Sequence, residues 1–211
     1  MAILKRTYGI LFAGAATAAV IGLSAAPAFA ATTWTVSPGG AITAKSGKTT
    51  LTDTTTDTVL TCKSSSTSAT LKSGSGLKGA GLGSITAVTF KTCTGPLSLT
   101  FTVTTNALPW KLNAKSYNST TGVTTGTITG IDATLSGADC SATVDGTAAG
   151  ADNGEVKATY TNSTGKLKVK TTGGNLHIYD VSGCAGLIAD GDATTFSATY
   201  TVSPIQTITG S

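Results

Sequence analysis

The chain is poor in charged side chains, and after residue 30 it contains no arginine at all. Charged residues make up only 11% of the 211 residues, although the formal net charge is +4. Arginine is the usual bidentate partner of phosphate and guanine, so this excess of positive charge does not indicate a nucleic-acid-binding surface. We therefore expect no nucleic-acid partner.

Long apolar runs and helical periodicity are also missing beyond residue 30. No later segment is apolar enough to cross a membrane as a helix, and none sustains the i, i+3, i+4 pattern of an amphipathic helix. The composition is instead dominated by Thr, Ser, Gly, Ala and Val, with many short alternating segments between turn residues. This pattern predicts one all-β domain over residues 31–211, a β-sandwich or barrel of Greek-key or jelly-roll type. The candidate strands are 33–37, 58–63, 69–72, 85–92, 97–105, 110–114, 124–135, 141–145, 155–161, 166–171, 175–181 and 195–202.

The first thirty residues are predicted to be a signal peptide and not part of the fold. Lys5 and Arg6 make a basic start, residues 10–23 are an apolar run, and residues 28–30 (Ala-Phe-Ala) match a cleavage signature. We expect secretion by the general export route and a mature chain that begins at Ala31. Its twelve lysines and ten acids leave a net charge of about +2.

The four cysteines all lie in the predicted exported part, and none shows the close spacing of a zinc or redox site. Each half of the chain has an early cysteine (Cys62, Cys140) and a late one (Cys93, Cys184), and a Ser-Ala-Thr-aliphatic segment follows each early one. We interpret this as a weak internal repeat, which predicts the disulfides Cys62–Cys93 and Cys140–Cys184. Similar Ser/Thr/Ala composition without duplication is the alternative explanation of the likeness.

The segment 90–105 illustrates the alternation on which the fold prediction depends. Leu97, Leu99, Phe101 and Val103 alternate with hydroxyl residues, which is the period-two pattern of a strand with one buried face. Residues 94–96 (Thr-Gly-Pro) are typical of a turn. We therefore expect one strand to end at Cys93 and the next to begin at Leu97.

Several motifs resemble a family of small secreted actinobacterial proteins without an established function. The motifs are LPW at 108–110 with LN at 112–113, GVTTGTITG at 122–130, GCAGL at 183–187 and YTVSP at 200–204. They are turn, strand and cysteine patterns that cover most of the predicted mature chain. The resemblance implies bacterial origin and export, and it supplies no catalytic residues.

Candidate chemistry is sparse. His177 is the only histidine, and no GxSxG elbow accompanies it, so we interpret it as a solvated or hydrogen-bonded strand residue. Residues 152–155 and 190–192 offer carboxylates and glycine bends, yet neither has the full ligand spacing of a calcium loop. We predict no catalytic residue, no metal site and no cofactor.

Aromatic side chains are the remaining candidates for a binding surface. Trp34, Trp110, Tyr117 and Tyr179 are the rings that we select as candidate ligand-facing residues, because rings on an outer sheet face stack on sugars. Core packing is the alternative, and it is favoured for Trp110. The expected partners are cell-wall or extracellular polysaccharide, or a protein.

The leading functional hypothesis is a secreted, non-enzymatic β-domain that acts as a binding or structural module outside the cell or in its envelope. One alternative is a carrier of a small apolar ligand, which an interior cavity would favour. A second alternative is an envelope pore, and an extracellular hydrolase ranks last.

Overall fold

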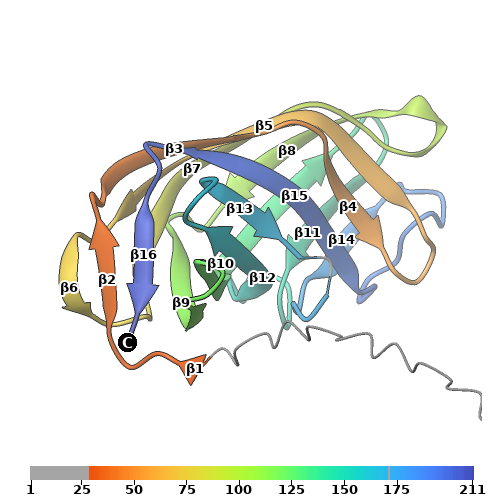
Figure 1. The fold of residues 1–211 in the computed structure, drawn as a ribbon. Helices are drawn as coiled ribbons and strands as arrows, with labels where there is room; N and C mark the ends of the chain where they lie inside the picture. The colour runs from red at the N-terminus through yellow and green to blue at the C-terminus, as the bar shows by residue number, and fades with distance from the viewer. Residues whose placement is uncertain (1–28, 171) are drawn as a thin grey trace, which may run out of the picture.

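The computed structural model describes residues 29–170 and 172–211, and it is almost entirely antiparallel β structure (Figure 1). No α-helix occurs in these two ranges, and the short 3₁₀ turn η1 (Pro96–Ser98) links two strands. The predicted all-β class is therefore confirmed. The strands are β1 (Phe29–Ala30), β2 (Trp34–Ser37), β3 (Gly40–Ser46), β4 (Thr49–Asp53), β5 (Val59–Leu71), β6 (Gly74–Leu77), β7 (Gly83–Thr94), β8 (Thr100–Asn106), β9 (Trp110–Asn118), β10 (Val123–Ser136), β11 (Ser141–Asp145), β12 (Gly154–Thr161), β13 (Lys166–Val169), β14 (His177–Ser182), β15 (Thr194–Ser203) and β16 (Thr207–Gly210).

The main sheet closes on itself. Neighbouring strands pair in the order β9, β7, β5, β3, β15, β13, β12 and β10, and β10 then pairs with β9. The sequence left a β-sandwich and a barrel open, and a closed ring of strand pairings is the arrangement of a barrel. A closed sheet has an inside and an outside, so the side chains of every strand divide between an enclosed core and the solvent.

The pairing partners of β10 change partway along this strand. β10 pairs with β9 up to Thr129 and with β12 up to Ile131. It pairs with β8 from Asp132 onward and with β11 from Ala133 onward. Gly130, at φ +82°, lies at this break in register, where a residue with a side chain would be strained. At the same end of the molecule β4 takes the place of β3 between β5 and β15. The far end of the ring is therefore formed by a second set of strands, with β14 beyond β11.

Alternation within the strands explains which face is buried. On β12, Val156, Ala158 and Tyr160 are buried, while the residues between them are half-buried or exposed. On β15, Ala198, Tyr200 and Val202 repeat the pattern. Each of these strands therefore has an apolar face towards the core and a Thr- and Lys-rich face outside, as period-two patterning requires.

A second, three-stranded sheet covers one end of the ring, at the left of Figure 1. It has the order β16-β2-β6, and its residues Trp34 and Val36 are almost completely buried in the common core. Gln206 lies fully buried at this end and receives the Gly39 N–H at its Oε1, 2.8 Å away. This end of the closed sheet is therefore plugged.

Both predicted disulfides are present, Cys62–Cys93 and Cys140–Cys184. Each joins neighbouring antiparallel strands: Cys62 and Cys93 are cross-strand partners on β5 and β7, and Cys140 and Cys184 flank the paired strands β11 and β14. Disulfides persist in oxidising environments, so these bonds indicate an extracellular-type environment. Internal duplication stays a prediction.

Several predicted strand boundaries were wrong. Leu97 does not begin a strand: it has φ +54° inside η1 and is 85% exposed, because Pro96 starts a turn that continues to Ser98. The segments 58–63 and 69–72 belong to a single strand, β5, whose middle carries only Ser and Thr. The sequence prediction missed β3, β4 and β16 and assigned β6 to a turn.

Residues 1–28 of the predicted signal peptide lie outside the described residues. The last two residues of that prediction, Phe29 and Ala30, pair with Tyr117 and Ser116 as β1. No helix within 29–170 or 172–211 has the length and apolar character needed to cross a membrane.

Candidate functional site

The interior of the closed sheet contains an apolar cavity of about 100 Å³, here called the inner cavity. Its walls come from nearly every strand of the ring, and all its lining residues are buried or half-buried. Phe90 and Phe196 meet edge to face across it, with ring centroids 6.0 Å apart. The lining includes Leu51, Leu60, Ile85, Val88, Phe90, Val103, Trp110, Leu135, Val144, Val169, Phe196 and Tyr200.

A second apolar cavity of about 140 Å³, the mouth cavity, lies at the unplugged end. It shares Leu51, Leu60 and Leu135 with the inner cavity, so the two spaces are neighbours separated by these three leucines. Exposed residues such as Leu97 and Ala185 line it as well, so it reaches the surface. The mouth cavity is therefore a surface opening that lies next to the inner cavity.

Three connections form the rim of the mouth cavity: η1 with Leu99, the β10–β11 turn at 137–140, and the loop 183–188. The Cys140–Cys184 disulfide joins the second connection to the third. On the opposite side, Thr56 and Thr58 of the β4–β5 turn each donate a hydroxyl hydrogen bond to Leu187 O at 2.9 Å. The loop 183–188 is thus held covalently to the β10–β11 turn and by hydrogen bonds to the β4–β5 turn.

The short strand β4 contributes the polar groups of the interior. Thr49 lines the inner cavity and Asp53 lines the mouth cavity. Leu51, which lies between them on the same face of the strand, lines both. Asp53 is 2% exposed and Thr49 is 1% exposed. Thr49 Oγ1 and Asp53 Oδ2 are buried without a hydrogen-bond partner within the described chain. Sequence reasoning missed both residues, since TTLTD lacks a recognisable apolar alternation.

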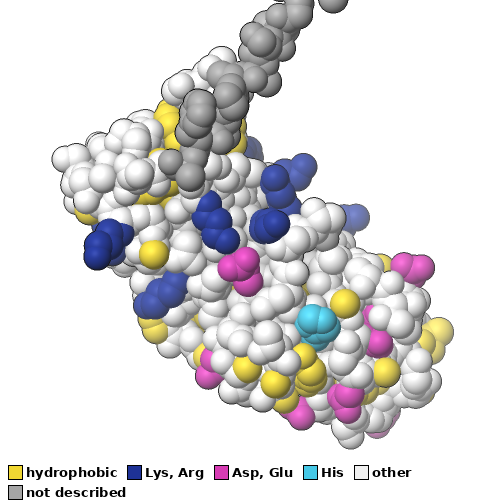
Figure 2. All heavy atoms as spheres, turned by 90° about the horizontal axis from the view of Figure 1, so that it is seen from below, with side chains coloured by type: hydrophobic (Ala, Val, Ile, Leu, Met, Phe, Trp, Pro, Cys, Tyr) yellow, Lys and Arg dark blue, Asp and Glu magenta, His cyan; other side chains and the backbone are white. Residues whose placement is uncertain are grey.

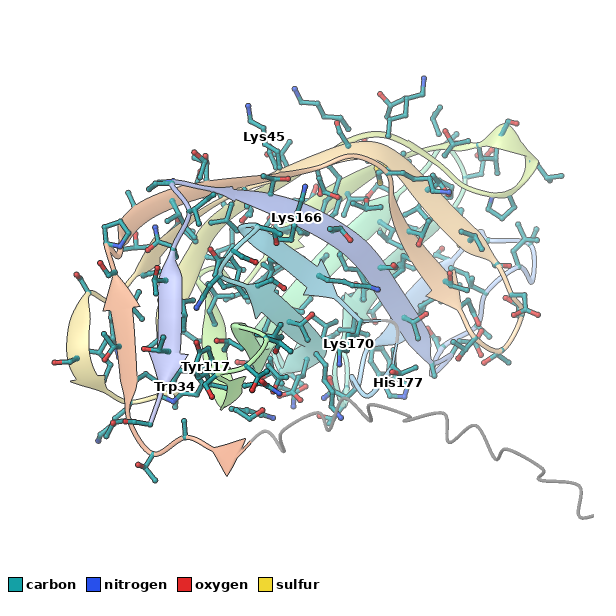
Figure 3. The ribbon with its side chains drawn as sticks, in the orientation of Figure 1. Trp34, Lys45, Tyr117, Lys166, Lys170 and His177 are labelled. Atoms are coloured by element: carbon teal, nitrogen blue, oxygen red, sulfur yellow. A yellow bond between two sulfur atoms is a disulfide. The ribbon has the colours of Figure 1, made fainter. Side chains whose placement is uncertain are left out.

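The four candidate aromatic residues do not form one surface. Trp34 is 1% exposed in the plug of the ring, and Trp110 is buried against the inner cavity with its Nε1 donating to Asn106 O at 3.0 Å. Tyr117 is half-buried against the core, and Tyr179 is half-buried with its hydroxyl donating to Gly146 O at 3.1 Å. Figure 3 shows Trp34 and His177 at opposite ends of the molecule. An outer stacking platform made of Trp34 and Trp110 is therefore excluded.

His177 is the first residue of β14, and its ring is half-buried. Its Nδ1 lies 2.8 Å from Asn175 O and 3.0 Å from Gly146 O. Both neighbours accept hydrogen bonds, so Nδ1 carries the proton and donates it to backbone carbonyls. A catalytic triad would instead direct this nitrogen towards a carboxylate. The geometry fits the prediction of a hydrogen-bonded strand residue.

An acidic cluster that the sequence did not reveal lies near the β11–β12 connection. Asp132, Asp145 and Asp152 each place a carboxylate oxygen within 4.8 Å of the others, so together they could hold a cation. Asp145, which is fully buried, accepts backbone N–H bonds from Gly146, Asp152 and Asn153 at 2.6–3.1 Å. Burial raises the pKa of Asp132, and the neighbouring Asp152 and Asp145 raise it further, against the lowering effect of the Asn106 hydrogen bond.

The two predicted acidic stretches behave differently. Asp190 and Asp192 bind only local backbone N–H groups, those of Val181 and Ala189. Asp152 alone of the 152–155 stretch joins the acidic cluster. The carboxylates of Asp190 and Asp192 are thus explained by turn geometry.

Lysines gather on one outer face of the closed sheet. Lys45 on β3 and Lys166 on β13 both face Thr201 of the strand between them, and Lys168 follows two residues later on the same face. Lys157 and Lys170 lie side by side, joined by a backbone hydrogen bond of 2.8 Å. Lys45 points upward in Figure 3, whereas Figure 2 views the molecule from below and shows other lysines over one half and acidic residues mostly over the other. This lysine face could attract anions.

Comparisons with known proteins found no matching family model, no curated relative and no similar solved structure. The resemblance to small actinobacterial proteins therefore stays a prediction.

Proposed function

We propose that this protein is a secreted, non-enzymatic binding protein that carries a small apolar ligand inside its closed sheet. The single observation that supports this function is the pair of neighbouring apolar cavities, one internal and one open at the rim. For scale, an engineered apolar cavity of about 150 Å³ binds benzene or xenon. The mouth cavity, at about 140 Å³, is close to that volume, and the inner cavity, at about 100 Å³, is about two-thirds of it.

The architecture supports the same function. The β16-β2-β6 sheet plugs one end of the ring, and the mouth cavity opens at the other, so a ligand would have a route in and out at that end. Aromatic and aliphatic walls with few polar groups are typical of small-molecule sites. The one disulfide at the rim, Cys140–Cys184, would hold such a site open in an oxidising environment, which agrees with secretion.

The other hypotheses have less support. The outward face of the ring is rich in Thr, Ser and Lys, for example Thr159, Lys168 and Thr199, whereas a pore needs an apolar band there. His177 hydrogen-bonds backbone carbonyls, which gives a hydrolase no activated base.

Methyl NMR during a titration with toluene tests the proposal. We expect saturable shifts confined to methyl groups that line the cavities, those of Leu51, Leu60 and Leu135 above all. Shifts restricted to the outer face, or no saturable shift up to the solubility limit of toluene, would overturn the proposed function. Native mass spectrometry of protein recovered from its host culture would then identify the bound ligand.

The lysine face favours a second function, attachment to an anionic polymer of the cell envelope. Lys45, Lys166 and Lys168 project from adjacent rows of the sheet, and such a surface binds polyanions in a salt-dependent way. Sedimentation with isolated cell walls at low and high salt tests this function. Lys166→Gln with Lys168→Gln should weaken association, while Lys72→Gln with Lys78→Gln, at exposed positions around β6, should not. Equal loss in both variants would contradict a specific lysine face.

A further inference from the structure

The strongest unexplained feature of the interior is the carboxyl group of Asp53, at the end of β4. Its Oδ1 accepts the backbone N–H groups of Thr55 and Thr56 at 2.7 and 3.1 Å, which fixes the group in place. Its Oδ2 is buried and has no hydrogen-bond partner in the described chain. A buried carboxylate oxygen without a partner carries a large desolvation cost.

No basic side chain compensates this group. The one ion pair among residues 29–170 and 172–211 joins Lys115 to Glu155 on the outer surface. Thr194, directly opposite Asp53 on β15, is also buried, and its Oγ1 has no partner either. Opposite residues of an antiparallel pair have Cβ atoms about 4.5–5.5 Å apart. Two unpaired oxygen groups therefore lie next to each other on β4 and β15, and Asp53 is the one of the two that lines the mouth cavity.

Asp53 lines this largely apolar cavity together with two other polar residues, Thr58 and the exposed Asp139, and the apolar walls continue inward past Leu51 to the inner cavity. Thr49, whose hydroxyl also lacks a partner, lies four residues from Asp53 along β4. At roughly 3.4 Å per residue the two polar positions are about 14 Å apart. The site thus offers a hydrogen-bond acceptor near its entrance and a slim apolar space behind it.

We infer that the ligand is a slender amphipathic amine, whose ammonium group binds Asp53 Oδ2 at the mouth and whose apolar chain extends inward past Leu51. This inference rests on the proposed function and specifies its ligand class. Hydrogen bonds between ionised partners are roughly twice as strong as neutral ones, so an ammonium group satisfies Asp53 best. A free carboxylate head group would be repelled by Asp53.

Isothermal titration of the full chain with octylamine, 1-octanol and octanoate tests the inference, since the three probes share one apolar tail. We expect octylamine to bind at least tenfold more tightly than 1-octanol, and octanoate to bind most weakly. In Asp53→Asn, which keeps an acceptor for Thr55 and Thr56, the affinity for octylamine should fall at least tenfold. The affinity for 1-octanol should stay within twofold of the wild-type value. Asp180→Asn is the matched control at an exposed strand position and should change nothing.

The outcomes separate this inference from the proposed function. If toluene and 1-octanol bind in the interior but the three head groups bind equally, or Asp53→Asn leaves the preference for octylamine unchanged, the amine inference is wrong and the carrier function stands. That outcome is expected if the partner of Asp53 in solution is a water molecule and not an ammonium group. If no probe enters the interior, the carrier function fails and the inference with it. Should Asp53→Asn not fold, the wild-type ranking of the head groups decides alone.

Discussion

Tyr160 and Gln206 close the plugged end of the sheet by exchanging two hydrogen bonds. The Tyr160 hydroxyl donates to Gln206 O and accepts from Gln206 N–H, both at 2.9 Å, and both residues are buried. Burial raises the pKa of Tyr160, although the bond to Gln206 O lowers it, so the hydroxyl keeps its proton. The chain segment between β15 and β16 is thereby fixed against β12.

Tyr160→Phe should therefore lower the free energy of unfolding by about 1–3 kcal/mol, because it leaves a buried N–H and a buried carbonyl without partners. Tyr179→Phe, which removes one half-buried bond at the other end, should cost about 0.5–1.5 kcal/mol. Urea denaturation of the two variants and the wild type compares them. A neutral effect of Tyr160→Phe would mean that water replaces the hydroxyl.

The Cys140–Cys184 disulfide should stabilise the protein and also hold the mouth cavity in shape. It closes a loop with a sequence separation of 44, for which the chain-entropy model gives about 4 kcal/mol. Replacing both cysteines by serine should cost roughly this free energy and weaken toluene binding. The same replacement at Cys62 and Cys93 should cost a similar amount with a smaller effect on binding, since of these two only Cys62 lines a cavity, the inner one, whereas Cys140 and Cys184 both line the mouth cavity. Equal loss of toluene binding in the two variants would argue against a specific role at the rim.

The exposure of Leu97 corrects the sequence prediction and can be measured. Leu97→Ser should change the free energy of unfolding by no more than about 0.5 kcal/mol, as is usual for exposed positions. Phe101→Ser, at a half-buried position of β8 that lines the mouth cavity, should cost more than about 1 kcal/mol. Equal losses in thermal or urea unfolding would place Leu97 in the core, contrary to the structure.

Asp132 should make stability fall as the pH rises. Its pKa is raised from the ordinary value of 3.8, so the folded state binds this proton more tightly than the unfolded state does. The stability from this group is complete below about 3.8 and is lost as the pH rises through the raised folded value.

Asp132→Asn, which can still accept from Asn106, should therefore gain stability relative to the wild type as the pH rises through that window. The measurement is urea unfolding at several pH values between about 3 and 7, with a chelator present to exclude bound cations. Parallel stability curves for the two proteins would contradict the raised pKa.

The sequence predicted the fold class and both disulfides because these depend on local alternation and on cysteine placement. β12 and β15 follow the apolar-polar pattern and were found nearly to the residue. β4 was missed because its buried positions 49 and 53 carry the polar residues Thr and Asp, so the strand lacks the apolar-polar alternation that sequence reasoning looks for. The closure of the ring and the meeting of Asp53 with Thr194 depend on pairings between segments 141 residues apart, which a single sequence does not reveal.

The candidate aromatic residues show the same limit of prediction from a single sequence. Period-two patterning says that Trp110 and its neighbours alternate, but it does not say which face of the strand is enclosed once the sheet closes. Trp110 does line the inner cavity, but Phe90, Phe196 and Tyr200, which line it as well, lay in predicted strands and were not selected as ligand-facing.

Filling the mouth cavity tests the central claim most directly. Ala142 on β11 is buried and lines this cavity, whereas Ala87 on β7 is exposed on the outer face. The affinity for toluene is measured by methyl NMR titration in Ala142→Leu and Ala87→Leu beside the wild type. Our account predicts that Ala142→Leu weakens toluene binding at least tenfold, because its added carbons occupy ligand space, while Ala87→Leu binds as the wild type does. Unchanged affinity in a folded Ala142→Leu variant would contradict an interior ligand site.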